Sequence, residues 1–254
     1  MDSPFAALHR PGQPFLLPNA WDVVSAALLA DAGFPAIGTT SLGVAASAGV
    51  PDAAGATRPQ TLALARRLVH LPALITVDIE AGFSDDPGQV AELVAELHEY
   101  GVVGINIEDG RGQELAPVDV QARLIATVRS AVPGVFINAR TDAYWLHRPM
   151  ALAETLTRVA AYRDAGAHGV FVPGVRAPAE IEAVVQAIDL PVNVLADRPL
   201  PELAALGVAR VSCGSLLYRH AVQAAAATAR GLAAGQSPPA GVPSYADVTH
   251  LLDG

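Results

Sequence analysis

Acidic side chains stand at the ends of two successive strands that the sequence predicts. Asp78 and Glu80 are two residues apart, so on an extended strand they would point the same way, and Glu108 ends the next strand. Three carboxylates that converge on one mouth repel one another unless a cation lies between them. Because no His or Cys cluster lies nearby, oxygen ligands of this kind select a hard ion, Mg²⁺ or Mn²⁺. The alternative is that one or two of these acids cap loops or are solvated surface charges.

Arg140 ends another predicted strand, after the mostly apolar run 135–139. An arginine keeps its charge, so the side chain must find a partner. A functional partner would be a substrate carboxylate or the negative charge that develops on an oxygen during a reaction. A structural partner would be Asp142 or Glu108, and both roles can hold at once.

The segment 38–47 (GTTSLGVAAS) is small and rich in hydroxyl groups. We expect it to form a loop that presents backbone N–H groups and hydroxyls to an anion.

Residues of this kind need a scaffold that brings strand ends together. Short β-branched runs alternate with longer segments of helical period that are rich in Ala, Leu and Arg. The predicted strands are 15–18, 36–39, 73–78, 103–108, 135–140, 169–173, 192–195 and 210–212. The predicted helices are 20–32, 59–69, 87–100, 118–131, 151–165, 178–187 and 199–206, with an eighth from Ala221. Eight strands, each followed by a helix, predict a (β/α)8 barrel. A doubly wound open sheet competes, but no G-x-G-x-x-G follows the first strand.

Barrel enzymes place their chemistry at the carboxyl ends of the strands. Polar residues gather at these predicted ends, and the opposite ends carry no comparable set. Asn193, near the end of the seventh strand, therefore joins the substrate-binding candidates. We predict one barrel domain over residues 1–254, with its core at about 15–220 and a C-terminal helix and tail at 221–254.

Composition narrows the chemistry further. All 16 basic residues are Arg, and the chain has no Lys. This excludes enzymes that form a lysine Schiff base and P-loop NTPases, which need a lysine on the phosphates. The formal net charge of −9 disfavours nucleic acid as a partner. A single cysteine, Cys213, allows no internal disulfide, and neither a signal peptide nor a membrane-spanning stretch is visible, so we expect a cytoplasmic protein without a membrane partner.

Motifs along the chain match one known family in order and spacing. They are 17–22 (LPNAWD), 38–43 (GTTSLG), 49–52 (GVPD), 78–83 (DIEAGF), 104–110 (GINIEDG), 137–142 (INARTD), 169–174 (GVFVPG) and 211–215 (VSCGS). With these motifs, the chain resembles the isocitrate lyase/phosphoenolpyruvate mutase superfamily from about residue 15 to 220. The resemblance implies a (β/α)8 barrel, usually in a tetramer that exchanges its last helix between subunits.

The resemblance also implies roles for individual residues. Acids matching Asp78, Glu80 and Glu108 would hold Mg²⁺ largely through water, with a 2-oxo acid or its enolate on the metal. Residues 40–42 would hold the substrate carboxylate, namely Thr40, Ser41 and Leu42. Asp52 would lie near the metal site, and Arg140 would stabilise the enolate oxygen. Arg140, Asp52 and Glu108 are thus the catalytic candidates.

The chain departs from that family in the loop after Glu108. The lyase branch has a Cys there that serves as acid and base, and the mutase branch has Lys and Asn, whereas 110–117 reads GRGQELAP. Ordinary isocitrate or methylisocitrate lyase chemistry is therefore not expected. An acid could come from water, Glu114, Tyr144 or His147.

The residues that would bind the metal, stabilise the enolate and hold the substrate carboxylate are still present. They predict a Mg²⁺-dependent enzyme, a lyase, decarboxylase or hydrolase, that cleaves a C–C or P–C bond next to the 2-oxo group of a small carboxylate, as a homo-oligomer (dimer or tetramer). The alternative is a catalytically reduced member that binds a 2-oxo acid without turnover. A sugar-phosphate barrel enzyme is a third reading, but the last two strands lack a Gly-rich phosphate loop.

Overall fold

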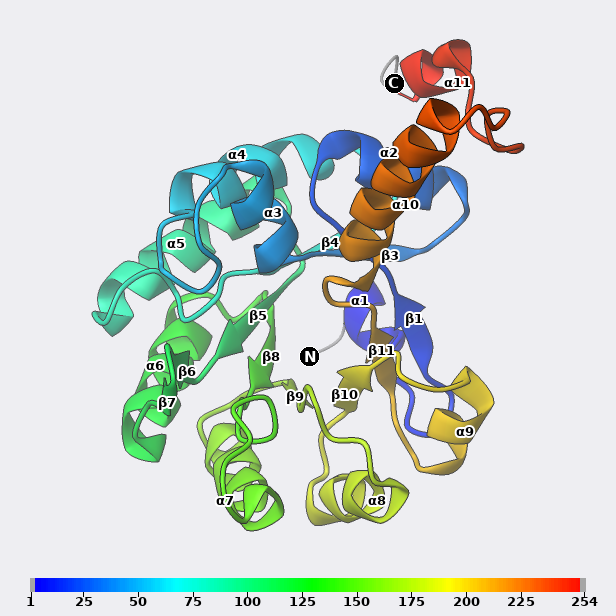
Figure 1. Cartoon of the computed structure of the whole chain (residues 1–254). Coiled ribbons are helices and arrows are strands. Elements are labelled where there is room, and N and C mark those ends of the chain that lie inside the picture. The colour runs from blue at the N-terminus through cyan, green and yellow to red at the C-terminus, as the bar shows by residue number, and fades with distance from the viewer. Residues whose placement is uncertain (1–2, 252–254) are drawn as a thin grey trace.

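Parallel strands form the centre of the molecule in a computed structural model that describes residues 3–251 (Figure 1). The strands are β1 (Phe15–Leu17), β2 (Asn19–Ala20), β3 (Ala36–Thr39), β4 (Leu74–Asp78), β5 (Gly104–Glu108), β8 (Phe136–Arg140), β9 (Gly169–Phe171), β10 (Val192–Leu195) and β11 (Arg210–Ser212). Their order in the sheet is β1-β11-β10-β9-β8-β5-β4-β3-β2, and every neighbouring pair is parallel. The predicted (β/α)8 barrel is confirmed.

One stretch of chain closes the barrel. Its first half, β1, pairs with β11, and its second half, β2, pairs with β3. The two halves meet at Pro18, which has no N–H to donate to a ladder. The carbonyl of Pro18 still accepts a hydrogen bond from the N–H of Gly38 at 2.9 Å. The first predicted strand is therefore present, in two short pieces.

Helices surround the sheet and cover its apolar outer face (Figure 1). They are α2 (Val23–Asp31), α4 (Arg58–Leu68), α5 (Pro87–Tyr100), α6 (Val118–Ala131), α7 (Ala151–Asp164), α8 (Pro178–Ala187), α9 (Leu200–Ala205) and α10 (Leu216–Ala233). Local signals set their limits, as at α5, where Asp86 accepts the N–H of Gly88 and Gly101 ends the helix at φ 112°. The eighth helix, α10, begins at Leu216, earlier than the Ala-rich run suggested.

Segments outside the strand–helix repeat differ most from expectation. The expected loop 38–47 is mostly helix α3 (Ser41–Ser47), because its small residues let the chain coil directly after β3. The segment after β5 is a hairpin of β6 (Gly110–Arg111) and β7 (Glu114–Leu115). A short helix, α1 (Pro4–Ala7), places Phe5 against Phe15 and Phe136, the first residues of β1 and β8, and so covers the amino-terminal end of the barrel.

The C-terminal part of the chain extends beyond the ring of helices. α10 leaves the barrel at the upper right of Figure 1 and is followed there by α11 (Tyr245–His250). No residue of α10 is buried. Within residues 3–251 no helix is both long enough and apolar enough to cross a membrane.

Candidate active site

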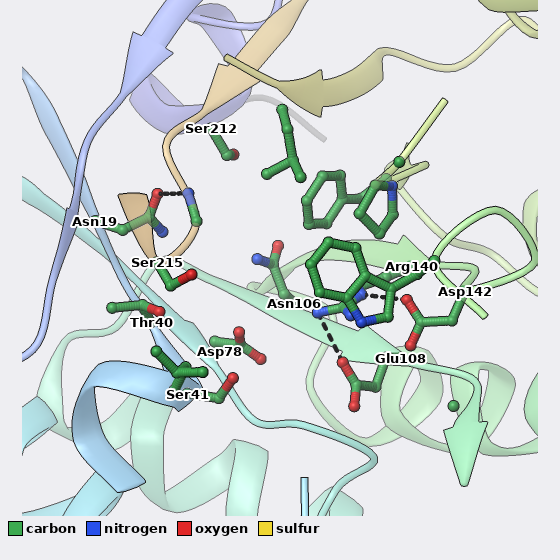
Figure 2. A pocket seen from close by; sticks show the side chains of 18 of the residues that line it. Asn19, Thr40, Ser41, Asp78, Asn106, Glu108, Arg140, Asp142, Ser212 and Ser215 are labelled. Atoms are coloured by element: carbon green, nitrogen blue, oxygen red, sulfur yellow. Dashed lines mark hydrogen bonds and ion pairs between the residues drawn. The ribbon is translucent and has the colours of Figure 1, made fainter. Parts of the chain in front are cut away.

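A cavity of about 700 Å³ opens at the carboxyl ends of the strands (Figure 2). This is the mouth where the sequence placed the chemistry. Its lining includes seven of the nine predicted site residues, namely Thr40, Ser41, Leu42, Asp52, Asp78, Glu108 and Arg140. Glu80 and Asn193 do not line it. The tertiary structure thus brings together most of the predicted site from β3, β4, β5 and β8 and from the segment around Asp52.

Arg140 is held between two carboxylates. Its Nη1 lies 2.8 Å from Oε2 of Glu108, and its Nε donates to Oδ1 of Asp142 at 2.6 Å. Its guanidinium carbon lies 5.9 Å from the ring centre of Trp145 and 5.8 Å from that of Phe171. Both structural partners considered for Arg140 are therefore present, and the side chain still borders the cavity (Figure 2).

The charged groups around Arg140 shift one another's pKa values. Burial raises the pKa of Glu108 to about 8, the positive charge of Arg140 opposes this rise, and the carboxylates of Asp142 and Asp78 add to it. The neighbouring carboxylates raise the pKa of Arg140 above its ordinary value against the effect of burial. A cluster with this excess of carboxylates favours an added cation.

Asp78 points into the cavity from the end of β4. Its Oδ1 accepts the N–H of Glu80 at 3.1 Å, and its own N–H donates to Oγ1 of Thr39 at 2.9 Å. Burial raises the pKa of Asp78, while the charge of Arg140 lowers it. The carboxylate is thus fixed by backbone contacts close to Arg140.

Glu80 does not continue the strand that ends at Asp78, so the extended geometry that would point both side chains the same way is absent here. The strand ends at Asp78, and Glu80 has a left-handed backbone with φ 51°. Its carboxylate accepts the hydroxyl of Thr57 at 2.5 Å and the N–H of Gly55 at 3.1 Å. Glu80 therefore anchors the segment that follows Asp52, a residue of the cavity lining.

The donor atoms of the cavity fit a hard cation bound through water. Asp52, Asp78 and Glu108 supply carboxylate oxygens to one cavity. In the described part of the chain, no three His, Cys, Asp or Glu side chains lie close enough together to ligate an ion directly. A divalent cation such as Mg²⁺, which retains several of its waters, suits such a site better than Zn²⁺, which takes tetrahedral N and S ligands.

The residues expected at the substrate carboxylate lie together at the start of α3. Thr40 precedes the helix, with no hydrogen bond from its side chain to the helix, and Ser41 and Leu42 are its first residues. Gly43 packs closely here, because a Cβ at this position would lie 2.6 Å from Cβ of Trp21 and 2.9 Å from Cγ2 of Thr40. Close packing of this kind holds the three residues in place.

Asn193 lies below the cavity, not in its wall. It is 1% exposed, and its Oδ1 accepts the hydroxyl of Ser212 at 3.1 Å. Of the acid candidates, Glu114, Tyr144 and His147 are absent from the cavity lining, and Glu114 pairs with Arg148 at 3.2 Å. The hairpin contributes only Gly110, Gly112 and Gln113 to the lining.

A buried network that the sequence analysis missed supports the site from behind. Asp109 is fully buried and accepts the N–H of Asp142 at 2.8 Å, the hydroxyl of Tyr162 at 2.6 Å and Nη1 of Arg158 at 3.1 Å. Because Asp142 in turn holds Arg140, this network links the position of Arg140 to α7. The signal was available in part, since Asp109 directly follows Glu108.

Comparison with known proteins identifies the family. The family model for phosphoenolpyruvate phosphomutase matches residues 5–233. The chain belongs to the isocitrate lyase/phosphoenolpyruvate mutase superfamily. It is therefore built as an enzyme of that superfamily, and the resemblance read from its motifs is confirmed.

Three relatives show the range of the similarity. An uncharacterised protein of Mycobacterium tuberculosis is 45% identical over 98% of this chain and 95% of its own length. An oxaloacetate decarboxylase of Marinomonas is 30% identical over 87% of this chain and 81% of its own. Phosphonopyruvate hydrolase, solved with oxalate and Mg²⁺, superposes with a TM-score of 0.85 at 25% identity, covering 98% of this chain and 93% of that one.

Proposed function

We propose that this protein is a Mg²⁺- or Mn²⁺-dependent enzyme that cleaves a C–C or P–C bond next to the 2-oxo group of a small carboxylate, through an enolate. The observation that carries the proposal is Arg140, fixed by Glu108 and Asp142 at the wall of an acid-lined cavity. An arginine that is already oriented can stabilise charge that develops on an oxygen without first reorganising. The relative solved with oxalate and Mg²⁺ supports the same combination of anion and metal.

Each side chain has a separate task in this proposal. Thr40, Ser41 and Leu42 bind the substrate carboxylate at the start of α3. Asp52, Asp78 and Glu108 hold the cation through its waters, and Glu80 holds the segment that carries Asp52. When bound, the cation supplies Lewis-acid stabilisation of the enolate oxygen.

The composition of the hairpin after β5 limits the type of reaction that the site can catalyse. Residues 110–117 hold no Cys, His or Lys, and within this stretch only the two glycines and Gln113 line the cavity. A β-decarboxylation needs no protein acid at this place. The bond to the leaving carboxylate breaks, its electron pair passes to the carbonyl oxygen as an enolate, CO₂ leaves, and water protonates the enolate carbon. The similarity to an oxaloacetate decarboxylase supports this reaction type.

The cavity has room for more than oxaloacetate itself. At about 700 Å³ it lies within the range of roughly 300–1,000 Å³ typical of sites for much larger ligands. Its side towards β9 and β10 carries apolar side chains, among them Trp145, Phe171, Pro173 and Leu195, next to the charged Arg176 and Asp197. We therefore expect substrates with an alkyl group on the carbon next to the 2-oxo group to be favoured.

Turnover of candidate substrates tests the proposal directly. The protein is incubated with Mg²⁺ and oxaloacetate, 3-alkyl oxaloacetates, methylisocitrate, other 2-substituted malates or phosphonopyruvate, and pyruvate or glyoxylate is measured. We expect turnover that EDTA abolishes and that Asp78→Ala reduces to background. If EDTA left ligand binding unchanged, the metal assignment would be wrong.

A second candidate function is binding of a 2-oxo acid without turnover. The hairpin favours it, because it carries none of the Cys, His or Lys side chains that would do acid–base work. Oxalate or pyruvate binding without product above the Asp78→Ala background would select this function over the first. In either case we propose a homo-oligomer in the cytoplasm that acts on a small carboxylate.

A further inference from the structure

Arg210 is a fully buried arginine in the middle of the barrel, below the cavity. It lies two residues before Ser212 on β11, so both side chains face the barrel interior. Its Nη2 donates to Oδ1 of Asn106 at 3.2 Å, and its Nε donates to Oγ of Ser212 at 3.3 Å. Asn106 and Ser212 both line the cavity (Figure 2).

The charge of Arg210 is unpaired. Among the ion pairs within 4.0 Å in residues 3–251, none includes Arg210. Burial lowers its pKa to about 9, which still leaves the side chain protonated at neutral pH. Barrel interiors are usually filled with Val, Ile and Leu, and a buried charge without a partner is unfavourable. A residue that breaks a packing rule in this way is expected to serve the site.

The contact with Asn106 determines which way its side-chain amide points. Oδ1 of Asn106 accepts from Arg210 and also from Nδ2 of Asn138 at 2.8 Å. Two donors on the oxygen leave the Nδ2 group to face elsewhere. Asn106 is the register partner of Asp78 on the neighbouring strand, and it reaches the cavity lining.

We propose that Arg210 is a positioning residue that holds the Asn106 amide with its N–H groups towards the cavity, where they donate to an oxygen of the bound 2-oxo acid. The inference rests on the proposed function, because it requires an anion in this cavity. Asn106 is thereby an additional substrate-binding residue, supplied by the same strand as Glu108.

Oxalate binding in the presence of Mg²⁺, measured by calorimetry, tests the inference. We expect Arg210→Met and Asn106→Leu each to weaken binding about tenfold, which is the effect of losing one hydrogen bond to a charged group. The double variant should be no weaker than about the stronger single effect, because both changes remove the same oriented donor. Arg210→Lys, which can still donate to Asn106, should recover part of the affinity.

Thermal unfolding separates this role from a purely structural one. In Arg210→Met, Asn106 keeps its bond from Asn138 and Ser212 keeps its bond to Asn193, so no partner is orphaned and an unpaired charge is removed. We therefore expect unchanged or higher stability together with weaker oxalate binding. His9→Phe, which changes a buried side chain at the amino-terminal end of the barrel, serves as the control and should leave oxalate binding unchanged.

The possible failures are distinguishable. If the wild-type protein binds oxalate and Arg210→Met binds it equally well, the role of Arg210 is refuted while the proposed function stands. Lower stability of Arg210→Met with unchanged affinity would likewise show that Arg210 is only structural. If the wild-type protein binds no oxalate with Mg²⁺, the proposed function fails, and the inference fails with it.

Discussion

At the scale of single residues, charge and burial decide the behaviour of the barrel interior. Arg140 is stabilised by two carboxylates, whereas Arg210 has only neutral partners. His9 is stacked on Phe136 with 4.2 Å between ring centres, and its Nδ1 is 3.0 Å from the carbonyl oxygen of Phe5. Each of these groups is held in one protonation state by its surroundings.

The burial of His9 leads to a prediction about how stability depends on pH. Burial, with the charge of Arg210, lowers the pKa of His9 from 6.5 to about 3. Below pH 6.5 the unfolded chain therefore binds a proton that the folded protein does not, and stability falls by about 1.4 kcal/mol per pH unit from this residue until the folded pKa is reached. His9→Phe removes that loss. Urea unfolding between pH 8 and pH 5 compares the free energies of unfolding of the two proteins. Below pH 6.5 the stability of the variant should rise relative to that of the wild-type protein, and a constant difference over this range would contradict the assignment.

At the scale of elements, the hairpin β6–β7 supports the segment around Glu108, which holds Arg140. Nη1 of Arg111 donates to the carbonyl oxygens of Glu108 and Gly110, and Nη2 donates to Oε1 of Gln121 on α6. Glu114 joins the hairpin to Arg148, in the segment after Trp145. The stretch that holds acid–base residues in the lyase and mutase branches is here a short structural turn.

The hairpin also makes a steric prediction at Gly110. A Cβ at this position would lie 2.5 Å from Oδ2 of Asp142, the residue that holds Nε of Arg140. We expect Gly110→Ala to displace Asp142, to weaken oxalate binding about tenfold and to cost roughly 1–3 kcal/mol of stability. Gly88→Ala is the matched control, because a Cβ there would meet only the exposed side chain of Asp86. Equal oxalate affinity in both variants would show that the position of Asp142 does not determine how Arg140 is oriented for binding.

At the scale of the whole molecule, α10 requires an explanation. Its 18 residues include none that is buried, and Val222 and Leu232 are 52% and 48% exposed. Apolar side chains on a helix that leaves the barrel favour association with another copy of the chain. The first turn of α10 also lines the cavity through Leu216 and Arg219, so association would occur close to the site.

Solution mass tests this prediction. Light scattering should give two or four times the chain mass of 26.1 kDa. A Val222→Glu/Leu232→Glu variant should shift the mass towards a single chain, because two buried charges disfavour an apolar interface. A mass of one chain for the wild-type protein at micromolar concentration would show that α10 is exposed in solution.

The sequence by itself determined the barrel and the strand ends that carry most of the candidate site. Apolar runs, glycines at helix ends and acids after the runs depend on local periodicity, and they predicted the strands, Asp78, Glu108 and Arg140 at one mouth. Asn106 also has the same strand parity as Glu108, so a strict reading of alternation would have included it.

Only the tertiary structure decided the direction of side chains beyond the strand ends and the partners across the barrel. Glu80 has a left-handed backbone, a torsion that residue spacing does not encode, and its carboxylate accepts from Thr57 and Gly55. Asn193 is below the cavity, since its place depends on how far β10 is offset from its neighbours. The bond between Arg210 and Asn106 joins residues 104 positions apart, and only closure of the barrel brings such residues together.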